Sequence, residues 1–510
     1  MTDPHQRALL VGDVPALHAA NPASRNRVAV TDGRRSLSWR ELDERTNALA
    51  GGVATHAGGP GEPVAVYAGN RIEYLELIYG LAKAGHPIVP LSPRLVPAEV
   101  ARSVRVTGAR VLVTDQLGDD LVVTRMRDGD PEPIASYADV VAAGGTMPEP
   151  PAETAPFRLS FTSGTTGSPK VCVVPHRVAM QMWADMTAEF GIGADDMELV
   201  AGPLFHGLGF TCALQQLYTG GAAYVLPRFD PRLVVDAVTG ARPTVLPGVP
   251  IMFDRVLDVL DAAGPDVRTD SVRFVLNSGA RVSGTQKRRL AKAFPEAEVC
   301  EFLASTEAGI VTVNRTDPTG PKAESCGRPF FRTRVEAIDE RGEVLPPGQV
   351  GEIAKRGLLT GPVYLGDERR TAESFVNGWY RTGDLGYRDE DGYFFVVGRS
   401  KEVIVSGGTS IYPAEIEEII SGIDGVREVA VVGVPDETWG ESVKAAIVLA
   451  DGARVAPADV EARCRATLAG YKVPRLVEYI AELPRTPSGK ILRRELTAQT
   501  GHRRTGTGWT

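Results

Sequence analysis

Short apolar segments alternate with amphipathic helical segments over the first 400 residues, and this alternation constrains the fold more than any other feature. The apolar segments are rich in β-branched residues and bounded by Gly, Pro or Asp, as buried strands are. They lie at 63–69, 110–115, 222–227 and 272–279. Between them are helix-period segments such as the one from Trp39, which Ser36 or Ser38 could cap. The alternation predicts α/β layers.

The pattern changes near residue 400. The stretch "GYFFVVGRSKEVIVSGG" from Gly392 predicts two strands around a polar turn, and a short helix should follow from Pro413. Two more strands and a helix through Leu468 complete a smaller α+β pattern. Since 510 residues are too many for one core, we expect a large multi-layered α/β domain and a small one. The predicted regions are 1–400 (large N-terminal domain), 401–500 (small mobile C-terminal domain) and 501–510 (disordered tail).

Charge and cysteine content narrow the class of protein. The chain has 56 Lys and Arg against 64 Asp and Glu, a net charge of −8, which argues against nucleic-acid or anionic-membrane binding. It has no apolar run of the roughly 20 residues that span a bilayer, and no visible signal peptide. Its five cysteines form no C-x-x-C pair. We expect a cytoplasmic monomer or homodimer without a zinc site.

The loop "FTSGTTGSPK" at 161–170 is the first candidate for chemistry. It fits neither the P-loop nor the dinucleotide-binding fingerprint. Glycines such as Gly164 and Gly167 would nevertheless let backbone N–H groups approach a polyphosphate, and Lys170 would add a positive charge. Hydroxyl donors come from Ser163, Thr165, Thr166 and Ser168. On these residues alone, a flexible Gly/Ser/Thr hairpin turn is the favoured interpretation.

Six further phrases follow in a fixed order. They are "PLFHGLGF" from Pro203, "NSGA" from Asn277, "STEAG" from Ser305, "GWYRTGDLG" from Gly378, "GRSKEVIVSGGTSIYPAEIE" from Gly398 and "PRTPSGKILRREL" from Pro484. With the glycine loop, they resemble the signature motifs of the adenylate-forming superfamily, which includes acyl-CoA synthetases, nonribosomal-peptide adenylation domains and luciferases. The resemblance extends from Leu37 to Leu496 and implies an acyl-CoA synthetase-like fold.

The resemblance implies a two-step reaction. A carboxylate attacks the α-phosphate of ATP to give an acyl-adenylate and pyrophosphate, and a thiol, usually that of CoA, then displaces AMP. The implied cofactors are ATP, Mg²⁺ and CoA. Charge develops on the phosphates, so fixed donors and a metal should surround them. The branch that the chain resembles most is that of the aryl- or fatty-acid–CoA ligases.

The resemblance also implies roles for individual residues. The loop 163–170 would hold the β- and γ-phosphates, and Thr306 the α-phosphate. Thr166 and Glu307 resemble the magnesium-site pair. Asp384 would bind the ribose hydroxyls with Arg399 nearby, and Lys490 would bridge the α-phosphate and the incoming carboxylate after domain closure. The remaining implied positions are His206 (acyl gate), Gly279 and Ala280 (nucleotide contact), Lys401 (hinge), and Gly407 and Gly408 (thiol channel).

Two positions depart from the family pattern. The family usually has Tyr-Gly where this chain has Leu303 and Ala304, so adenine would be covered by apolar surface rather than by stacking, unless Phe302 compensates. The acyl pocket should be reshaped by the methyl group of Ala304. Ser410 stands where asparagine is frequent. None of these changes removes an implied phosphate or metal ligand.

The substrate prediction rests on "PLFHGLGF", which lacks the aspartate that amino-acid-activating domains usually carry there. We expect a hydrophobic carboxylic acid (aryl, alicyclic or medium-chain), and a dicarboxylate such as malonate if an arginine reaches the pocket. His206 is alternatively a core histidine. Alternatives for the whole chain are an acyl-AMP ligase that loads a free-standing carrier protein, an oxygen-dependent light-emitting relative, and a nucleotide-binding protein without activity.

Overall fold

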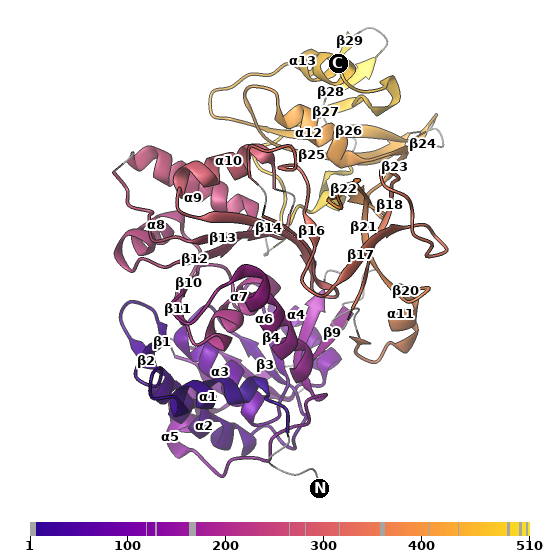
Figure 1. Cartoon of the computed structure of the whole chain (residues 1–510). Helices are drawn as coiled ribbons and strands as arrows, with labels where there is room; N and C mark the ends of the chain where they lie inside the picture. The colour runs from indigo at the N-terminus through magenta and orange to yellow at the C-terminus, as the bar shows by residue number, and fades with distance from the viewer. Residues whose placement is uncertain are drawn as a thin grey trace. The chain divides into compact units, whose positions relative to one another are not determined.

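The computed structural model describes residues 7–118, 120–127, 130–162, 170–264, 266–280, 282–315, 317–357, 363–406, 409–436, 438–486, 490–498, 502–505 and 508–509. The chain forms two compact units (Figure 1). Unit 1 comprises 1–334 with 355–380, and unit 2 comprises 335–354 with 381–510. The predicted boundary at residue 400 stays a prediction.

Unit 1 contains two large sheets. The first has nine strands in the order β16 (Arg328–Pro329), β15 (Gly309–Asn314), β14 (Glu298–Ser305), β13 (Phe274–Ser278), β12 (Val245–Gly248), β10 (Met197–Val200), β11 (Ala222–Val225), β1 (Val28–Thr31) and β2 (Ser36–Ser38). The second has eight, in the order β19 (Val363–Tyr364), β9 (Lys170–Pro175), β8 (Pro156–Thr162), β4 (Ile88–Leu91), β3 (Val64–Tyr67), β5 (Val111–Thr114), β6 (Val122–Arg127) and β7 (Asp130–Ser136).

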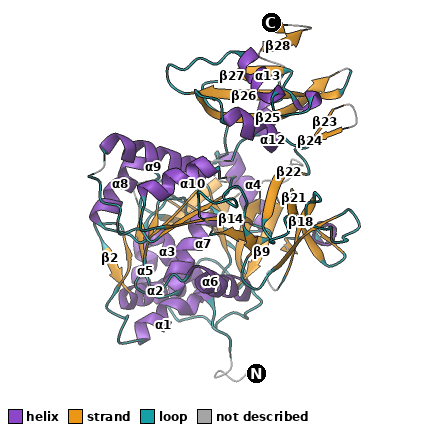
Figure 2. Ribbon diagram, turned by 45° about the horizontal axis from the view of Figure 1, so that its top comes forward, coloured by secondary structure: helices purple, strands orange, loops and turns teal. Residues whose placement is uncertain are grey.

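The helices of unit 1 cover these sheets (Figure 2). They are α1 (Val14–Ala20), α2 (Trp39–Ala54), α3 (Ile72–Lys83), α4 (Pro97–Thr107), α5 (Tyr137–Ala143), α6 (His176–Phe190), α7 (Gly207–Tyr218), α8 (Pro231–Gly240), α9 (Pro250–Ala263), α10 (Gly284–Ala293) and α11 (Glu368–Glu373). The largest core cluster joins both sheets through α2, α3, α6 and α7. A second core lies under α8, α9 and α10, on the other face of the first sheet.

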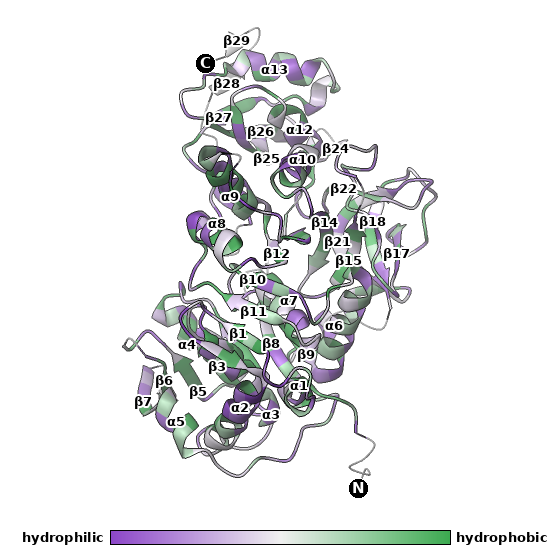
Figure 3. Ribbon diagram, turned by 60° about the vertical axis from the view of Figure 1, so that its left-hand side comes forward, coloured by the Kyte–Doolittle hydropathy of each residue, from purple (hydrophilic) through white to green (hydrophobic). Residues whose placement is uncertain are grey.

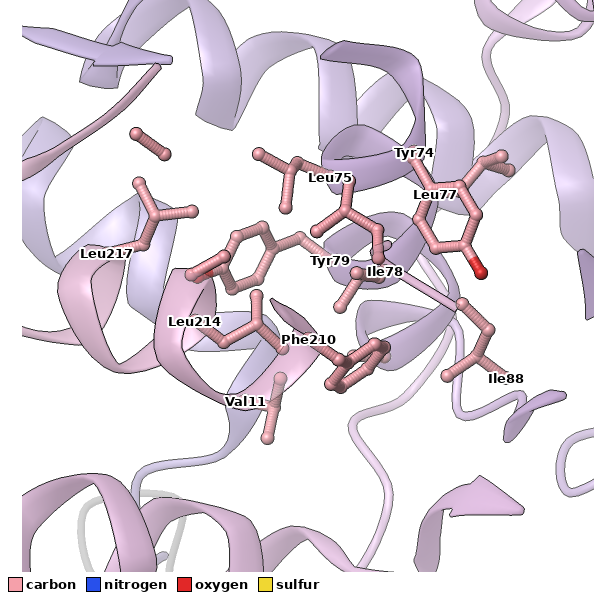
Figure 4. Close-up of a cluster of buried hydrophobic side chains, with 14 of the residues drawn as sticks. Val11, Tyr74, Leu75, Leu77, Ile78, Tyr79, Ile88, Phe210, Leu214 and Leu217 are labelled. Carbon is pink, nitrogen blue, oxygen red and sulfur yellow. The ribbon is translucent and has the colours of Figure 1, made fainter. Parts of the chain in front are cut away.

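Helices α3 and α7 meet in the largest core. Tyr79 and Leu75 of α3 lie opposite Leu214 and Phe210 of α7 (Figure 4). Each of these side chains is at most 1% exposed. Burying one such side chain stabilises the fold by roughly 1.5–3 kcal/mol. The packing therefore fixes α7, whose N-terminal end belongs to the predicted site.

Unit 2 is built on a seven-stranded sheet. Its strands are β24 (Thr409–Ile411), β23 (Ile404–Ser406), β26 (Gly440–Leu449), β27 (Leu476–Tyr479), β28 (His502–Thr505) and β29 (Gly508–Trp509), with β25 (Val426–Asp436) paired to β26. Its helices are α12 (Pro413–Ser421) and α13 (Pro457–Arg465). A further sheet has the order β17 (Arg334–Ile338), β18 (Gly351–Arg356), β21 (Trp379–Arg388) and β20 (Phe375–Val376), with β22 (Phe394–Arg399) paired to β21.

The predicted fold class is confirmed, and so are most of the predicted elements. All four apolar segments form parallel strands of the two large sheets, and Figure 3 colours two of them, β3 and β5, as hydrophobic. Helix α2 starts at Trp39 with Ser38 as its cap, since the Ser38 hydroxyl accepts from the Glu41 backbone N–H at 3.3 Å. The helix expected through Leu468 ends at Arg465. The predicted disorder of 501–510 stays a prediction.

Candidate active site

The Thr306–Glu307 pair occupies the tip of a hairpin between β14 and β15. Ser305 pairs with Gly309, which leaves a three-residue loop. Gly309 has φ +62°, the left-handed conformation that closes such loops and that glycine adopts without strain. The Ala308 N–H donates to the Ser305 hydroxyl at 2.9 Å. The sequence "STEAG" thus builds a tight turn that presents a hydroxyl and a carboxylate together.

Tyr364 lies against Lys170 and within electrostatic reach of Glu307. Lys170 is the first residue of β9, and its Nζ lies 5.4 Å from the centre of the Tyr364 ring. Burial, and then the negative charge of Glu307, raise the pKa of Tyr364. The same two causes raise the pKa of the Cys172 thiol, and the positive charges of Arg158 and Lys170 oppose this. A cation and an anion therefore flank one end of the β9–β19 pair.

The segment before α7 is held by Asn70. Its side-chain amide donates to the Gly202 carbonyl at 2.8 Å and accepts from the Leu204 N–H at 2.8 Å. His206 then forms the N-cap of α7. A Cβ on Gly207 would lie 4.0 Å from the Thr306 hydroxyl. The start of α7, whose free N–H groups give it a partial positive charge, therefore lies beside the hairpin tip.

The "NSGA" phrase covers the last two residues of β13 and the two residues after it. The Ser278 hydroxyl donates to the Phe302 carbonyl at 2.7 Å, tying this strand to β14. Gly279 has φ +93°, and a Cβ there would lie 3.0 Å from the Val249 side chain. Glycine is therefore required for both backbone conformation and space. Ala280, the next residue, is exposed.

The three residues predicted to lie near adenine differ in burial. Phe302 is 4% exposed, and its ring packs in the core 6.0 Å from that of Phe190. Leu303 and Ala304 are only partly buried. Since Phe302 points into the core, Leu303 and Ala304 are the side chains of this group with surface left to cover a base.

Unit 2 brings together three of the predicted residues, Asp384, Arg399 and Lys490. Asp384 and Arg399 face each other across β21 and β22, and the Arg399 Nε–Asp384 Oδ1 distance is 2.9 Å. Burial raises the pKa of Asp384, while the positive charges of Arg399 and Lys490 lower it and Glu402 raises it. Lys490 therefore lies within electrostatic reach of the carboxylate that the sequence assigns to ribose.

The Lys490 backbone is pinned to Thr486. Thr486 N–H donates to the Lys490 carbonyl at 2.7 Å, and Lys490 N–H donates to the Thr486 hydroxyl at 3.1 Å. Lys401 is exposed in the turn between β22 and β23. Eight predicted residues lie outside the described residues: Ser163, Gly164, Thr165, Thr166, Gly167, Ser168, Gly407 and Gly408.

The donors fit a magnesium ion that is held mainly by its nucleotide. Within the described residues, no three His, Cys, Asp or Glu side chains gather closely enough to hold a metal by themselves. Glu307 supplies one carboxylate, which lies within electrostatic reach of Cys172 on β9. Mg²⁺ commonly takes one or two carboxylates and completes its shell with phosphate oxygens and water. When bound, such an ion would neutralise charge on the phosphates.

The sequence analysis missed three residues that shape this site. Tyr364 lies against Lys170, Asn70 holds the segment before His206, and Lys355 donates to the carbonyl of Ala308 in the hairpin. Tyr364 follows the glycine loop by almost 200 residues, and Asn70 precedes His206 by more than 130. No local periodicity announces such contacts, because only the packing of distant elements creates them.

Solved structures show the class of enzyme. ATP-bound MatB from Rhodopseudomonas palustris has a TM-score of 0.84 and 26% identity to this chain, and the match covers 95% of this chain and 98% of that one. The fold is therefore that of an adenylate-forming enzyme, as the sequence motifs predict. In the described part of the chain, no helix combines the length and the apolar character needed to cross a membrane.

Family models and sequence relatives agree. An AMP-binding enzyme model matches residues 17–365, and an AMP-binding enzyme C-terminal domain model matches residues 415–490. A feruloyl-CoA synthase of Amycolatopsis is 36% identical over 93% of this chain and 96% of its own length. The fatty acid–[acyl-carrier-protein] ligase ScoC of Streptomyces coeruleorubidus is 34% identical over 91% of both chains. This chain belongs to the AMP-binding enzymes.

The predicted enzyme class is confirmed with the family. The chain is an AMP-forming acid–thiol ligase that acts through an acyl-adenylate, and ligases of this family use ATP, Mg²⁺ and CoA. The roles assigned to single residues stay predictions.

Proposed function

We propose that this enzyme activates a hydrophobic carboxylic acid (aryl, alicyclic or medium-chain) as its acyl-adenylate and transfers the acyl group to CoA. The observation that carries the proposal is the start of α7, which carries no acidic side chain, beside the Thr306–Glu307 hairpin. No Asp or Glu occurs between Leu199 and Phe229, so this region offers no carboxylate to an ammonium group. Phe205 and Leu208 pack against the core on either side of His206.

The proposed roles follow from the geometry of each unit. Thr306 donates to the α-phosphate and Glu307 faces the metal, because the hairpin presents both at its tip. Lys170 approaches the phosphates from the start of β9. In unit 2, Asp384 accepts from the ribose hydroxyls, and Lys490 offsets the repulsion between the carboxylate and the α-phosphate. That repulsion is roughly 1 kcal/mol at 4 Å in water and several-fold larger in a drier site.

A carrier protein is the second candidate acceptor. ScoC, a ligase that by its name loads an acyl carrier protein, is nearly as similar to this chain as the feruloyl-CoA synthase is. The activation step would be the same for both acceptors. Only the thiol that collects the acyl group would differ.

Pyrophosphate release tests both proposals. The enzyme is assayed with ATP and Mg²⁺ over a panel of aryl, alicyclic, fatty, amino and dicarboxylic acids, each with and without CoA. Acid-dependent turnover that requires CoA supports the main proposal and ranks the acids. Release that stops near one equivalent with CoA, and resumes with a carrier protein, supports the second candidate. A preference for malonate or for amino acids contradicts the hydrophobic substrate class.

A further inference from the structure

Lys355 is a buried lysine directly behind the hairpin that carries Thr306 and Glu307. It lies near the end of β18 and is 1% exposed. Its Nζ donates to the Ala308 carbonyl at 2.7 Å and to the Ile310 carbonyl at 2.8 Å. These two carbonyls flank Gly309, the left-handed residue that closes the hairpin loop.

The two carbonyls lie at the end of β15 that does not pair with β16. On its outer edge, β15 pairs with β16 only at Thr312 and Val313, and the Phe330 N–H then donates to the Val311 carbonyl at 3.0 Å. The hairpin continues past that point toward its tip. Buried backbone carbonyls need a donor, and Lys355 supplies it in place of a strand.

An ammonium is a costly donor to bury. Burial lowers the pKa of Lys355 to about 8, and Asp185 on α6 opposes this. The Asp185 carboxylate is itself bound by Gln181 and Arg332, so it is shared among several donors. An apolar residue would fill a strand position at lower cost. The ammonium of Lys355 therefore serves in this part of the core as the hydrogen-bond donor to the two carbonyls.

We propose that Lys355 is a positioning residue for adenylation, which holds the hairpin 305–309 so that Thr306 and Glu307 keep one orientation. It touches no substrate and acts through the carbonyls of Ala308 and Ile310. The inference rests on the proposed function, because it assumes that Glu307 faces the metal. Loss of Lys355 should weaken the use of Mg²⁺ and nucleotide, and leave acid binding nearly unchanged.

The test compares Lys355→Met with Lys355→Gln in the full-length enzyme. The first readout needs no turnover: it is the Mg²⁺ concentration that gives half of the rise in melting temperature on adding ATP. The second is the Mg²⁺ dependence of pyrophosphate release, together with the KM for the acid. For Lys355→Met we expect about a tenfold higher Mg²⁺ requirement in both readouts and less than a twofold change in acid KM. Lys355→Gln keeps two N–H donors on a shorter, uncharged side chain, so we expect a two- to fourfold shift.

Lys287→Met is the matched control. Lys287 is 4% exposed and also donates to two carbonyls, those of Ala323 and Ser325, and it forms an ion pair with Glu301 of β14 at 2.5 Å; all three partners lie outside the hairpin loop 305–309. The Lys287→Met substitution should lower the melting temperature without changing the Mg²⁺ requirement. An unchanged Mg²⁺ requirement in Lys355→Met, or an equal shift in the control, overturns the inference. If Lys355→Met does not fold, Lys355→Gln decides, and no shift there overturns the inference as well. Failure of the proposed function itself would appear as wild-type enzyme that releases no acid-dependent pyrophosphate.

Discussion

The Asp384–Arg399 pair should respond very differently to the loss of either partner. The Asp384 side chain is 7% exposed and that of Arg399 is 48% exposed. Arg399→Gln removes the exposed partner and leaves a buried carboxylate with less compensation. Asp384→Asn removes the buried charge and leaves an arginine that water can solvate. The two substitutions break the same contact, so any difference between them measures the burial of the carboxylate.

The magnitude follows from the two limits for ion pairs. Breaking a fully buried pair costs 3–5 kcal/mol, and surface pairs contribute about 0–1 kcal/mol. Here one partner is half exposed and the Lys490 charge still acts on Asp384. We therefore expect a loss of about 2 kcal/mol for Arg399→Gln and of less than about 1 kcal/mol for Asp384→Asn.

The loss should also depend on pH. Burial already raises the pKa of Asp384, and removing Arg399 takes away a charge that lowers it. When the folded pKa lies above the unfolded value of about 3.9, stability falls as pH rises through the window between the two. The deficit of Arg399→Gln should therefore be larger at pH 8 and should shrink as the pH approaches that window.

Hydrogen exchange can measure this locally. Amides of β21 and β22, which pair from Asp384–Arg399 to Arg388–Phe394, report the free energy of opening this hairpin without requiring two-state unfolding of the whole chain. The double variant, with both substitutions, should resemble Asp384→Asn alone. Equal losses from the two single variants, or a deficit that stays constant with pH, would refute the reasoning.

Three other predictions concern unit 1 and the two half-reactions. Both carboxyl oxygens of Glu198 are buried without a hydrogen-bond partner in the described structure, and burial raises its pKa. Glu198→Met should therefore raise the melting temperature by an amount equivalent to about 1–3 kcal/mol, and by more at pH 8 than at pH 5. A variant with a lower melting temperature than the wild type at pH 8 contradicts this. Lys490→Ala should slow adenylation by about 10²-fold or more while thioester formation from supplied acyl-AMP largely survives; an equal fall in both half-reactions would show that Lys490 does not act specifically in the first. Asn70→Ala removes both hydrogen bonds that hold the segment before His206; the KM for the acid should rise at least fivefold with little change in the Mg²⁺ requirement, and steady-state kinetics with unchanged acid KM would contradict that.

Local patterns predicted the elements of the fold but not all of their partners. The two strands expected around the polar turn after Gly392 exist as β22 and β23. They nevertheless belong to different sheets, because β22 pairs with β21 whereas β23 pairs with β24 and β26. Periodicity reports that a segment is buried and extended, and it carries no information about which distant strand supplies its hydrogen bonds.

For the candidate site, too, the motifs predicted the chemical groups, whereas the packing decided the direction of some side chains. The motifs predicted a hydroxyl, a carboxylate and two lysines for the site, and the structure shows Thr306 and Glu307 on one tight turn. Burial changed the interpretation of Phe302, whose ring faces the core although the phrase around it suggested a surface for adenine. In a strand with a register shift between Leu303 and Ala304, the direction of each side chain depends on the pairing.

The sequence by itself determined the family, the reaction class and the chemical groups available for it, because short motifs of fixed order encode turns and charges that act locally. Only the tertiary structure decided which distant side chains hold the backbone of these motifs in place. Lys355 reads in the sequence as one more charged residue of a strand, and Asn70 as a loop residue. Folding turns them into the donors of two distant backbone segments, since buried carbonyls and N–H groups must find partners wherever the packing of the elements leaves them.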